Sequence, residues 1–449
     1  MPAMRAIVVG LGEVGQNVAR TLSAERHEVK VVERDPARVA LMQGEIDALV
    51  IEGNGASPKF LAEIGVGRAD LLCAVTQSDE ANVIAALAGH QLGAKQTIAR
   101  VRDDEYFGHD ESFARDVLGI DFVIHPERAT ADDLAEAIML PGAVQVEHFA
   151  DGLVSVAEVI LSDRSPVAGS PLRERRLKPP HAVVGIIREG RTQAAEPGYR
   201  PRPGDHLLIA AARDDIAATV AYVAGRAAAV RDVMIFGAGR IGLPLARRLE
   251  TTNGMNVTLM ESDAERARYV AERVRRATVL HEEGIGKEVL LAQGVGEAGA
   301  FVACAGDDRA NLLAALHAKQ AGVGLGLAVV SREEFVPLVD ALGIDAAFSP
   351  RLVTAEAILR SMRGENVHAM HLLLGGSEVL EVHAEPGCRA EGRTVEQANS
   401  IGWTHVAAIV RDGRVLMPDA GERVRAGDRV LVFSPRQGVA DVRRTFKAA

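Results

Sequence analysis

The sequence predicts an α/β protein made by tandem duplication, in which a parallel-sheet lobe and a small α+β lobe each occur twice. Two observations lead to this prediction. A G-x-G-x-x-G motif occurs at Gly10, Gly12 and Gly15 and again at Gly237, Gly239 and Gly242. Glycines outside these motifs also recur at one constant offset, pairing Gly169 with Gly392, Gly190 with Gly413, Gly198 with Gly421, and Gly204 with Gly427. The whole unit was therefore duplicated, even if these other glycines only serve tight turns.

The first 140 residues alternate strand-like and helix-like segments. Apolar runs rich in β-branched residues predict strands at residues 5–9, 28–32, 48–52, 71–75 and 97–101. Amphipathic segments predict helices at residues 14–23, 36–43, 57–64 and 79–92. Near-continuous apolar strands separated by helices are typical of a parallel sheet covered on both faces. We therefore expect a Rossmann-like lobe with its glycine turn at the carboxyl edge of the sheet.

From about Val144 the pattern changes to short strands with turn signals. Residues 188–191 (Arg-Glu-Gly-Arg) match residues 411–414 (Arg-Asp-Gly-Arg), and each predicts a two-residue hairpin turn. The predicted domains are residues 1–140, 141–226, 231–363 and 364–449, with boundaries near Pro141-Gly142, within residues 226–231 and within residues 363–366. Helix-like segments at residues 130–139 and 354–362 follow Pro126 and Pro350. Each either links its two lobes or packs against another copy.

The composition excludes several classes of protein. An apolar content of 48% supports a buried core, whereas 4% aromatic residues leave little for base stacking. A net charge of −10 gives no attraction to nucleic acid or to anionic lipid. No apolar run reaches the roughly 18–20 residues that span a bilayer. Three widely spaced cysteines exclude a disulfide framework and a structural zinc site. With no signal peptide at its start, the chain is expected to be soluble and cytoplasmic.

The first glycine motif predicts a nucleotide site. Its first glycine allows a sharp turn, the second allows backbone to approach a diphosphate, and the third allows a helix to pack closely on a strand. Glu33 ends the next strand, where a carboxylate accepts hydrogen bonds from ribose hydroxyls. A 2′-phosphate would be repelled there, which favours NAD over NADP, although the neighbouring Arg34 weakens that preference. The alternative is a glycine turn that binds nothing.

Further candidates lie at the same edge. Thr76 and Gln77 follow the fourth strand, and Asp79 is expected to cap the next helix rather than to contact a ligand. Arg100 ends the fifth strand, where its guanidinium either binds phosphate or forms a surface ion pair. Residues 53–55 (Gly-Asn-Gly) either line an adenine pocket or form a plain turn. The predicted cofactor-binding residues of the first copy are Gly10, Leu11, Gly12, Glu13, Val14, Gly15, Glu33, Thr76, Gln77 and Arg100.

The second copy keeps the three glycines and the acid of the nucleotide site but differs from the first copy at the other candidate positions. Aligning Asn82 with Asn311 places Ala305 opposite Thr76, Gly306 opposite Gln77 and Val329 opposite Arg100, and residues 281–284 replace the Gly-Asn-Gly turn. Arg240 could partly replace the missing positive charge. The site is thus a weaker dinucleotide site, a site for another adenine nucleotide, or a degenerate scaffold. Its predicted cofactor-binding residues are Gly237, Ala238, Gly239, Arg240, Ile241, Gly242 and Glu261.

Over its full length the chain resembles the TrkA family, the regulatory subunits of bacterial Trk potassium uptake systems, and each half is similar to an RCK (regulator of K⁺ conductance) unit. The residues that carry the resemblance are Gly10, Gly12, Gly15, Glu33, residues 74–76, Asp79, Glu80, Asn82 and, most distinctively, residues 98–106 (Ile-Ala-Arg-Val-Arg-Asp-Asp-Glu-Tyr). The resemblance implies binding of NAD(H), with ATP and ADP as further candidates. It also implies a homotetrameric ring at the inner face of the cell membrane, beneath a potassium-translocating membrane subunit, without membrane insertion.

A binding function is also favoured by what the chain lacks. A dehydrogenase usually adds a different domain that supplies a His, Lys or Tyr acid/base, and the duplicated halves leave little room for one. No H-E-x-x-H, Cys-x-x-Cys, G-x-S-x-G or P-loop lysine motif occurs, so no catalytic or metal-binding residue is predicted. A regulatory binding subunit is favoured over a nucleotide sensor with some other partner, and a soluble NAD-dependent oxidoreductase is the alternative.

Overall fold

The computed structural model describes residues 4–448, apart from residues 25, 104–105, 108–111, 141, 173–179, 189–190, 197, 226–229, 253, 283–284, 333–334, 363–369, 374–376, 401–404, 419–420 and 436–437. The chain forms two compact units. One consists of Met1–Thr130 with Ser349–Met362, and the other of Ala131–Phe348 with Arg363–Ala449. The predicted boundaries at Pro141, 226–229 and 363–366 lie outside the described residues.

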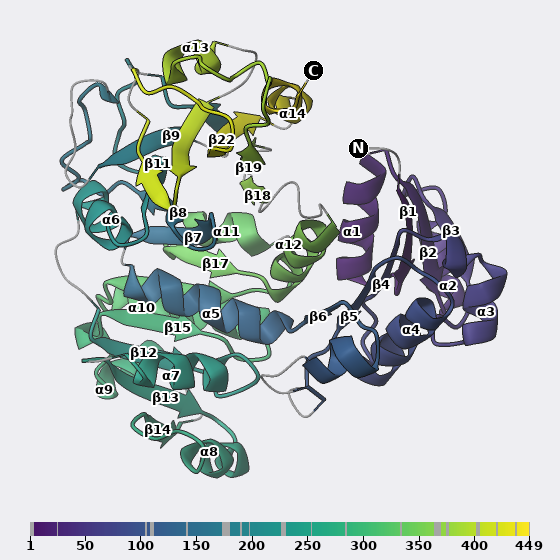
Figure 1. Cartoon of the computed structure of the whole chain (residues 1–449). Coiled ribbons are helices and arrows are strands. Elements are labelled where there is room, and N and C mark those ends of the chain that lie inside the picture. Colours follow the sequence, from purple (N-terminus) through teal and green to yellow (C-terminus); the bar gives the residue numbers. More distant parts are fainter. Residues whose placement is uncertain are drawn as a thin grey trace. The chain divides into compact units, whose positions relative to one another are not determined.

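The first unit contains a six-stranded sheet of order β3-β2-β1-β4-β5-β6 (Figure 1). Every neighbouring pair is parallel, as expected for a Rossmann-like lobe. The strands are β1 (Arg5–Val9), β2 (Glu28–Glu33), β3 (Leu49–Glu52), β4 (Leu71–Ala74), β5 (Thr97–Arg100) and β6 (Phe122–Ile124). Strand β6 was missed by the sequence prediction because it is only three residues long and lies at the sheet edge, where its burial pattern is mixed. We call this sheet and its helices the first lobe.

The helices of the first lobe follow the predicted segments closely. They are α1 (Glu13–Ala24), α2 (Pro36–Met42), α3 (Pro58–Glu63) and α4 (Asp79–Gln91), with a 3₁₀ turn at Val66–Arg68 and a π-helical turn at Phe113–Val117. Proline occupies the first position of α2 and of α3, where the missing N–H needs no partner.

The second lobe, which belongs to the second unit, repeats this architecture. Its six parallel strands have the order β14-β13-β12-β15-β16-β17. The strands are β12 (Asp232–Phe236), β13 (Asn256–Glu261), β14 (Thr278–His281), β15 (Ala300–Ala303), β16 (Leu325–Val329) and β17 (Ala346–Phe348). The helices are α7 (Gly242–Glu250), α8 (Ala264–Ala271), α9 (Lys287–Ala292), α10 (Asp308–Gln320) and α11 (Val336–Ala341). The tandem Rossmann-like prediction is confirmed.

Two helices cross from one half of the chain to the other, and we call them the crossover helices. Helix α12 (Pro350–Met362), which follows the second lobe, belongs to the first unit and packs against α1 (Figure 1). Residues 131–139 of α5 (Pro126–Met139), which follows the first lobe, belong to the second unit, where Leu134 and Ile138 share a core with Leu245. Both helices begin at their proline, four residues before the predicted segments.

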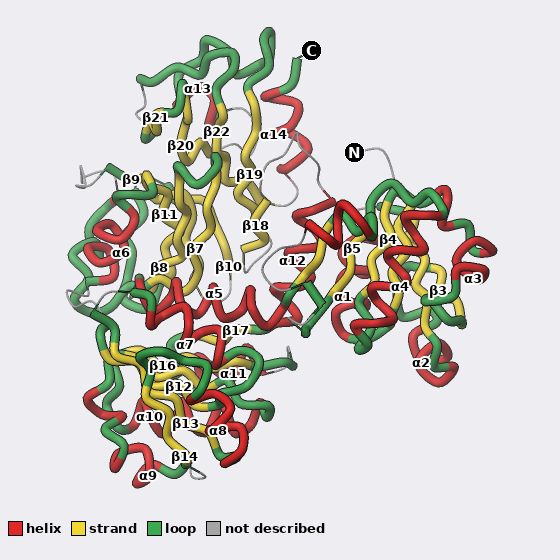
Figure 2. The backbone as a smooth tube through the Cα atoms, turned by 60° about the horizontal axis from the view of Figure 1, so that its bottom comes forward, coloured by secondary structure: helices red, strands yellow, loops and turns green. Residues whose placement is uncertain are grey.

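The small lobes are two five-stranded sheets whose neighbouring strands are antiparallel (Figure 2). One has the order β10-β9-β11-β8-β7 and the other β18-β19-β22-β20-β21. Their strands are β7 (Ala143–Phe149), β8 (Val154–Ile160), β9 (His181–Arg188), β10 (Arg191–Ala194), β11 (His206–Ala212), β18 (Met370–Leu373), β19 (Ser377–His383), β20 (His405–Arg411), β21 (Arg414–Leu416) and β22 (Arg429–Pro435). The helices are α6 (Ile216–Ala224), α13 (Val395–Asn399) and α14 (Val439–Phe446).

The two small lobes share one hydrophobic core, to which Leu208 and Phe433 contribute. The second predicted hairpin has Asp412 and Gly413 at positive φ between paired residues, as a type I′ turn requires. In the first hairpin Arg188 pairs with Arg191, whereas Glu189 and Gly190 lie outside the described residues. Within the described part of the chain, no helix is both long and apolar enough to cross a membrane.

Candidate functional site

The first glycine loop, residues 10–15, joins β1 to α1 at the carboxyl edge of the sheet. Gly10 has a φ of +108°, which only glycine adopts without strain. A Cβ atom on Gly15 would lie 1.9 Å from the Gly10 carbonyl oxygen, so the close packing of helix on strand requires glycine. A Cβ on Gly12 would meet no atom within 4 Å. The Gly12 backbone therefore faces open space, where a ligand can approach it closely.

Glu33, at the end of β2, is bonded to this loop. Its Oε2 accepts a hydrogen bond from the Leu11 amide at 2.8 Å. Its Oε1 accepts from the amides of Arg34 at 2.7 Å and Asp35 at 2.9 Å. Because a carboxylate oxygen has two lone pairs, these bonds leave Oε2 able to accept a further bond from a hydroxyl. Glu33 thus fixes the loop and still presents an acceptor beside it.

A cavity of about 420 Å³ lies against the loop and brings many of the predicted residues together. Its polar wall includes Gly10, Gly12, Glu33, Thr76 and Gln77, together with residues 53–55. Arg34 and Arg38 also line it. The predicted Arg100 is not among its lining residues. The cavity is therefore bounded by an acid, two arginines and exposed backbone, a combination that suits a ligand with hydroxyls and phosphates.

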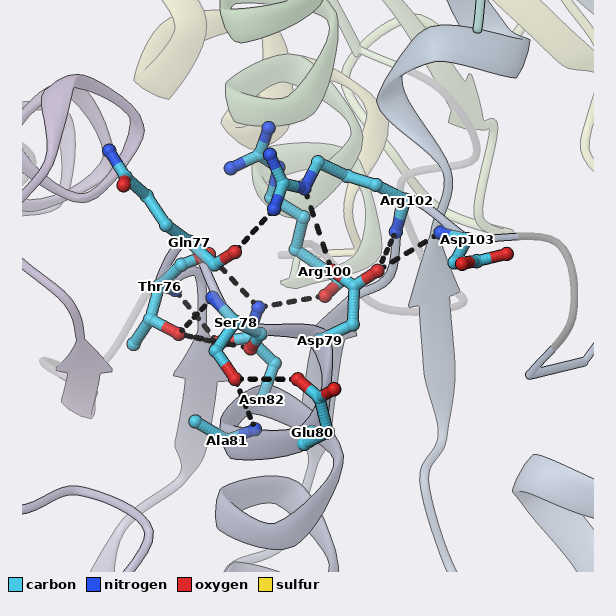
Figure 3. Close-up of polar contacts among 10 residues, drawn as sticks. All are labelled: Thr76, Gln77, Ser78, Asp79, Glu80, Ala81, Asn82, Arg100, Arg102 and Asp103. Carbon is cyan, nitrogen blue, oxygen red and sulfur yellow. Dashed lines mark hydrogen bonds and ion pairs between the residues drawn. The ribbon is translucent and has the colours of Figure 1, made fainter.

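The segment between β4 and α4 is held by side chains that cap the helix (Figure 3). Ser78 is the helix N-cap, and its hydroxyl accepts from the Ala81 amide at 3.1 Å. The prediction that Asp79 caps the helix was therefore wrong by one position. Asp79 instead accepts from the amides of Arg102 and Asp103, both at 3.0 Å, and so ties the chain that leaves β5 to the start of α4.

Asn82 is a structural residue whose role the sequence analysis missed. It is fully buried, and its Oδ1 accepts from the Thr76 amide at 2.8 Å and the Thr76 hydroxyl at 2.7 Å. Its Nδ2 donates to the carbonyls of Thr76 at 3.1 Å and Arg100 at 2.8 Å (Figure 3). One amide therefore fastens the ends of β4 and β5. The signal in the sequence for this role is the second asparagine, Asn311, at the aligned position of the second copy.

The basic residues after β5 have different environments. The Arg102 guanidinium donates to the Gln77 carbonyl, and its Nε lies 3.6 Å from Asp79 Oδ1. Arg102 therefore holds the backbone of Gln77, which lines the cavity, and is not itself among the lining residues. The Arg100 backbone is fixed by Asn82, and its partly buried side chain extends from the end of β5 (Figure 3). The sequence prediction did not single out Arg102 as a candidate.

The second glycine loop, residues 237–242, has the same backbone. Gly237 has a φ of +97°, a Cβ on Gly242 would lie 1.9 Å from the Gly237 oxygen, and a Cβ on Gly239 would meet nothing within 4 Å. Glu261 Oε2 accepts from the Ala238 amide at 3.0 Å, as Glu33 does from Leu11. The predicted residues Arg240 and Ile241 lie between Gly239 and Gly242, with Ile241 buried. The duplication therefore extends to the geometry of the loop.

The surroundings of the second loop differ from those of the first. Arg266, which aligns with Arg38, donates from Nε to the Ala238 carbonyl at 3.0 Å. The Cys304 thiol lies beneath the loop, 3.3 Å from the Gly237 oxygen. Burial, with the nearby Glu261 charge, raises the pKa of Cys304 to about 12, so the thiol stays protonated. Within the described residues, no group of three or more potential metal ligands is found.

The amino-acid sequence matches two family models. The TrkA-N domain model matches residues 6–126 and 233–350, which contain the two parallel sheets, and the TrkA-C domain model matches residues 379–447 in the second small lobe. The chain belongs to the TrkA family. Membership of the TrkA family agrees with the resemblance inferred from residues 98–106 and the glycine motifs.

Curated relatives align with essentially the whole chain. The Trk system potassium uptake protein TrkA of Azorhizobium caulinodans is 32% identical over 454 residues, which cover 99% of both chains. The protein of that name from Halomonas elongata is 31% identical over 453 residues and also covers 99% of both. A TrkA homolog from Archaeoglobus fulgidus is 31% identical over 449 residues, covering 99% of this chain and 100% of its own.

Solved structures share the fold of this TrkA family member. The GsuK channel bound to NAD superposes with a TM-score of 0.65 at 18% identity, covering 99% of this chain and 79% of that one. The isolated GsuK RCK domain gives the same TM-score and identity, and covers 99% and 95%. The chain therefore shares its fold, with tandem Rossmann-like and small lobes, with the GsuK RCK domain.

Proposed function

We propose that this protein is the regulatory subunit of a potassium uptake transporter, and that NAD(H) binding at its first lobe controls the membrane subunit. Nucleotide binding is supported above all by the open space at Gly12 beside Glu33, whose Oε2 already holds the Leu11 amide of the loop. A dinucleotide placed there meets backbone amides at the amino end of α1 and a ribose acceptor at Oε2. Membership of the TrkA family supports the transport role.

The cofactor-binding residues are proposed as a set in each lobe. Gly10, Gly12 and Gly15 shape the loop, Leu11, Glu13 and Val14 supply its remaining backbone, and Glu33 accepts from the ribose. Thr76 and Gln77 border the diphosphate, and Arg100 supplies positive charge near it. In the second lobe the corresponding residues are Gly237, Ala238, Gly239, Arg240, Ile241, Gly242 and Glu261.

The nucleotide is proposed to be NAD(H), with ATP and ADP as further candidates. The carboxylate of Glu33 disfavours a 2′-phosphate, although Arg34 and Arg38 line the same cavity. Solved structures of similar fold include the GsuK channel bound to NAD and, at a TM-score of 0.51 and 15% identity, GsuK bound to ADP. These two ligands support a site that accepts adenine nucleotides of either kind.

The partner is proposed to be the membrane potassium-translocating subunit, with this chain in a homotetrameric ring at the inner face of the cell membrane. We propose further that the chain is not an enzyme and binds no nucleic acid. We retain the division into domains at residues 1–140, 141–226, 231–363 and 364–449 as a proposal. The alternative, a soluble NAD-dependent oxidoreductase, would consume NADH with a suitable substrate, which nicotinamide absorbance detects.

Titration calorimetry with NAD, NADH, ATP and ADP tests the binding proposal. Glu33→Gln keeps the size of the side chain but weakens acceptance from ribose and from the three amides. We expect its NADH dissociation constant to rise about 30-fold, roughly 2 kcal/mol, as for the loss of a charge-assisted hydrogen bond. Glu28→Gln, at the opposite end of β2, is the matched control and should bind like the wild type. Absence of nucleotide binding by the wild-type protein would overturn the proposal.

Arg100 is expected to couple the nucleotide to a conformational change. Shifting an assembly from 1:99 to 99:1 takes about 5.5 kcal/mol, so four equivalent sites would each supply about 1.4 kcal/mol, roughly a tenfold preference. Arg100→Ala should therefore abolish the nucleotide-dependent change in potassium transport, measured in vesicles that contain the membrane subunit. Arg20→Ala, on the exposed surface of α1, should leave the response intact. An unaltered response in Arg100→Ala would contradict this role.

A further inference from the structure

The first glycine loop contacts a residue from the other half of the chain. Glu13, within the loop, is the first residue of α1, and it forms an ion pair with Arg351, the second residue of the crossover helix α12. Figure 1 shows α12 beside α1. The Arg351 side chain is 30% exposed and that of Glu13 is 48% exposed, so the pair is partly shielded from solvent. Burial lowers the pKa of the Arg351 guanidinium, which nevertheless stays charged at neutral pH.

The Glu13 carboxylate is unfavourable for a phosphate site when it is unpaired. It stands at the amino end of α1, where the helix dipole and the free N–H groups attract anions. A diphosphate that approaches Gly12 would therefore meet a neighbouring negative charge. The guanidinium of Arg351 compensates that charge only while the start of α12 lies against the loop. Docking of α12 and the affinity of the loop for phosphate are then linked.

The positions equivalent to Glu13 and Arg351 in the other copy also carry one acid and one arginine, but in exchanged places. Arg240 occupies the place of Glu13 in the second glycine motif. Glu127, which follows Pro126 at the start of α5, occupies the place of Arg351, which follows Pro350 at the start of α12. Each copy of the unit thus has one acid and one arginine at these two positions, in opposite order. Opposite charges at this pair of positions are therefore a shared property of both halves.

We propose that Arg351 is a positioning residue of the first nucleotide site, which neutralises Glu13 and makes the affinity for a diphosphate depend on the docking of α12. This inference rests on the proposed nucleotide function of the first lobe. By linkage, a bound diphosphate strengthens the docking of α12 to the same extent. Helix α12 begins directly after β17, the last strand of the second lobe. Nucleotide binding at the first site is thereby coupled to the second half of the chain.

A double-mutant cycle on the full chain, with NADH as the probe in titration calorimetry, tests the inference. Arg351→Met keeps an aliphatic stem for packing but leaves Glu13 uncompensated, so the dissociation constant should rise about tenfold, or 1.4 kcal/mol. Glu13→Gln leaves the positive charge of Arg351 uncompensated beside the diphosphate, and should lower the constant about threefold. The double variant Glu13→Gln/Arg351→Met should return close to the wild-type value, because no charge remains to be compensated.

A purely structural role for Arg351 predicts a different pattern, in which the double variant binds as weakly as Arg351→Met. That result would overturn the inference, as would an unchanged dissociation constant in Arg351→Met. Lys95→Met is the matched control, because it removes one cation from an ion pair with Asp70 at the opposite edge of the sheet. The titrations also separate this inference from the proposed function. If wild type and Arg351→Met bind NADH with the same affinity, only the inference is rejected. If the wild-type protein binds no NADH, the proposed function is rejected as well.

Discussion

Gly12→Ala is expected to abolish NADH binding at the first lobe without changing the melting temperature of the protein. A Cβ at this position meets no protein atom within 4 Å, so the folded loop accommodates the methyl group. The same methyl group stands where the backbone must approach the diphosphate. We expect the NADH dissociation constant, measured by titration calorimetry, to rise at least about 100-fold, which corresponds to roughly 2.7 kcal/mol.

Gly15→Ala is the matched comparison, because it adds the same methyl group three residues further along the loop. Its Cβ would lie 1.9 Å from the Gly10 carbonyl oxygen, so α1 and β1 must move apart. This variant should lose NADH binding, measured by titration calorimetry. It should also have a lower melting temperature, measured by circular dichroism during heating. If Gly12→Ala bound NADH with wild-type affinity, the diphosphate would not lie against the first glycine loop.

Asn82→Ala is expected to have the largest effect on local stability. The substitution removes the partner of the Thr76 amide and of two carbonyls at a fully buried position. Buried backbone groups without partners cost about 1–3 kcal/mol each, so local opening should become easier by about 3 kcal/mol. Hydrogen–deuterium exchange of the full chain should show amides of β4 and β5 exchanging roughly 100-fold faster.

Asn311→Ala provides the control in the second lobe. Asn311 bonds to the amide and carbonyl of Ala305 and to the carbonyl of Val329, as Asn82 does at Thr76 and Arg100. Its replacement should accelerate exchange in β15 and β16 and leave β4 and β5 unchanged. Equal exchange rates in wild type and Asn82→Ala would show that this amide does not hold the two strands together.

Local patterns in the sequence were sufficient to predict much of the fold and of the glycine loops. The apolar strands and amphipathic helices of the first lobe can be identified because their periodicity is set within single elements. Positive φ at Gly10 and the close approach at Gly15 follow from the order of residues in one short loop. Glu33 was identifiable because it ends the strand next to that loop.

Contacts between distant segments were harder to predict. The position of Asp79 was misjudged because Ser and Asp both cap helices, and the backbone amides that Asp79 binds belong to the chain after β5. Arg102 was overlooked because its partner is a backbone carbonyl, which has no sequence signature. The short edge strand β6 is recognisable only through its pairing with β5.

That this TrkA family member contains the same pair of lobes twice can be predicted from the amino-acid sequence, because glycine spacing, strand alternation and the acids Glu33 and Glu261 are properties of short segments. Which lobe each crossover helix packs against depends instead on long-range packing. Duplication gives both lobes similar apolar surfaces, so the pattern of α12 is compatible with either. Its packing on α1 brings Arg351 to Glu13, a contact that depends on long-range packing and that no local pattern encodes.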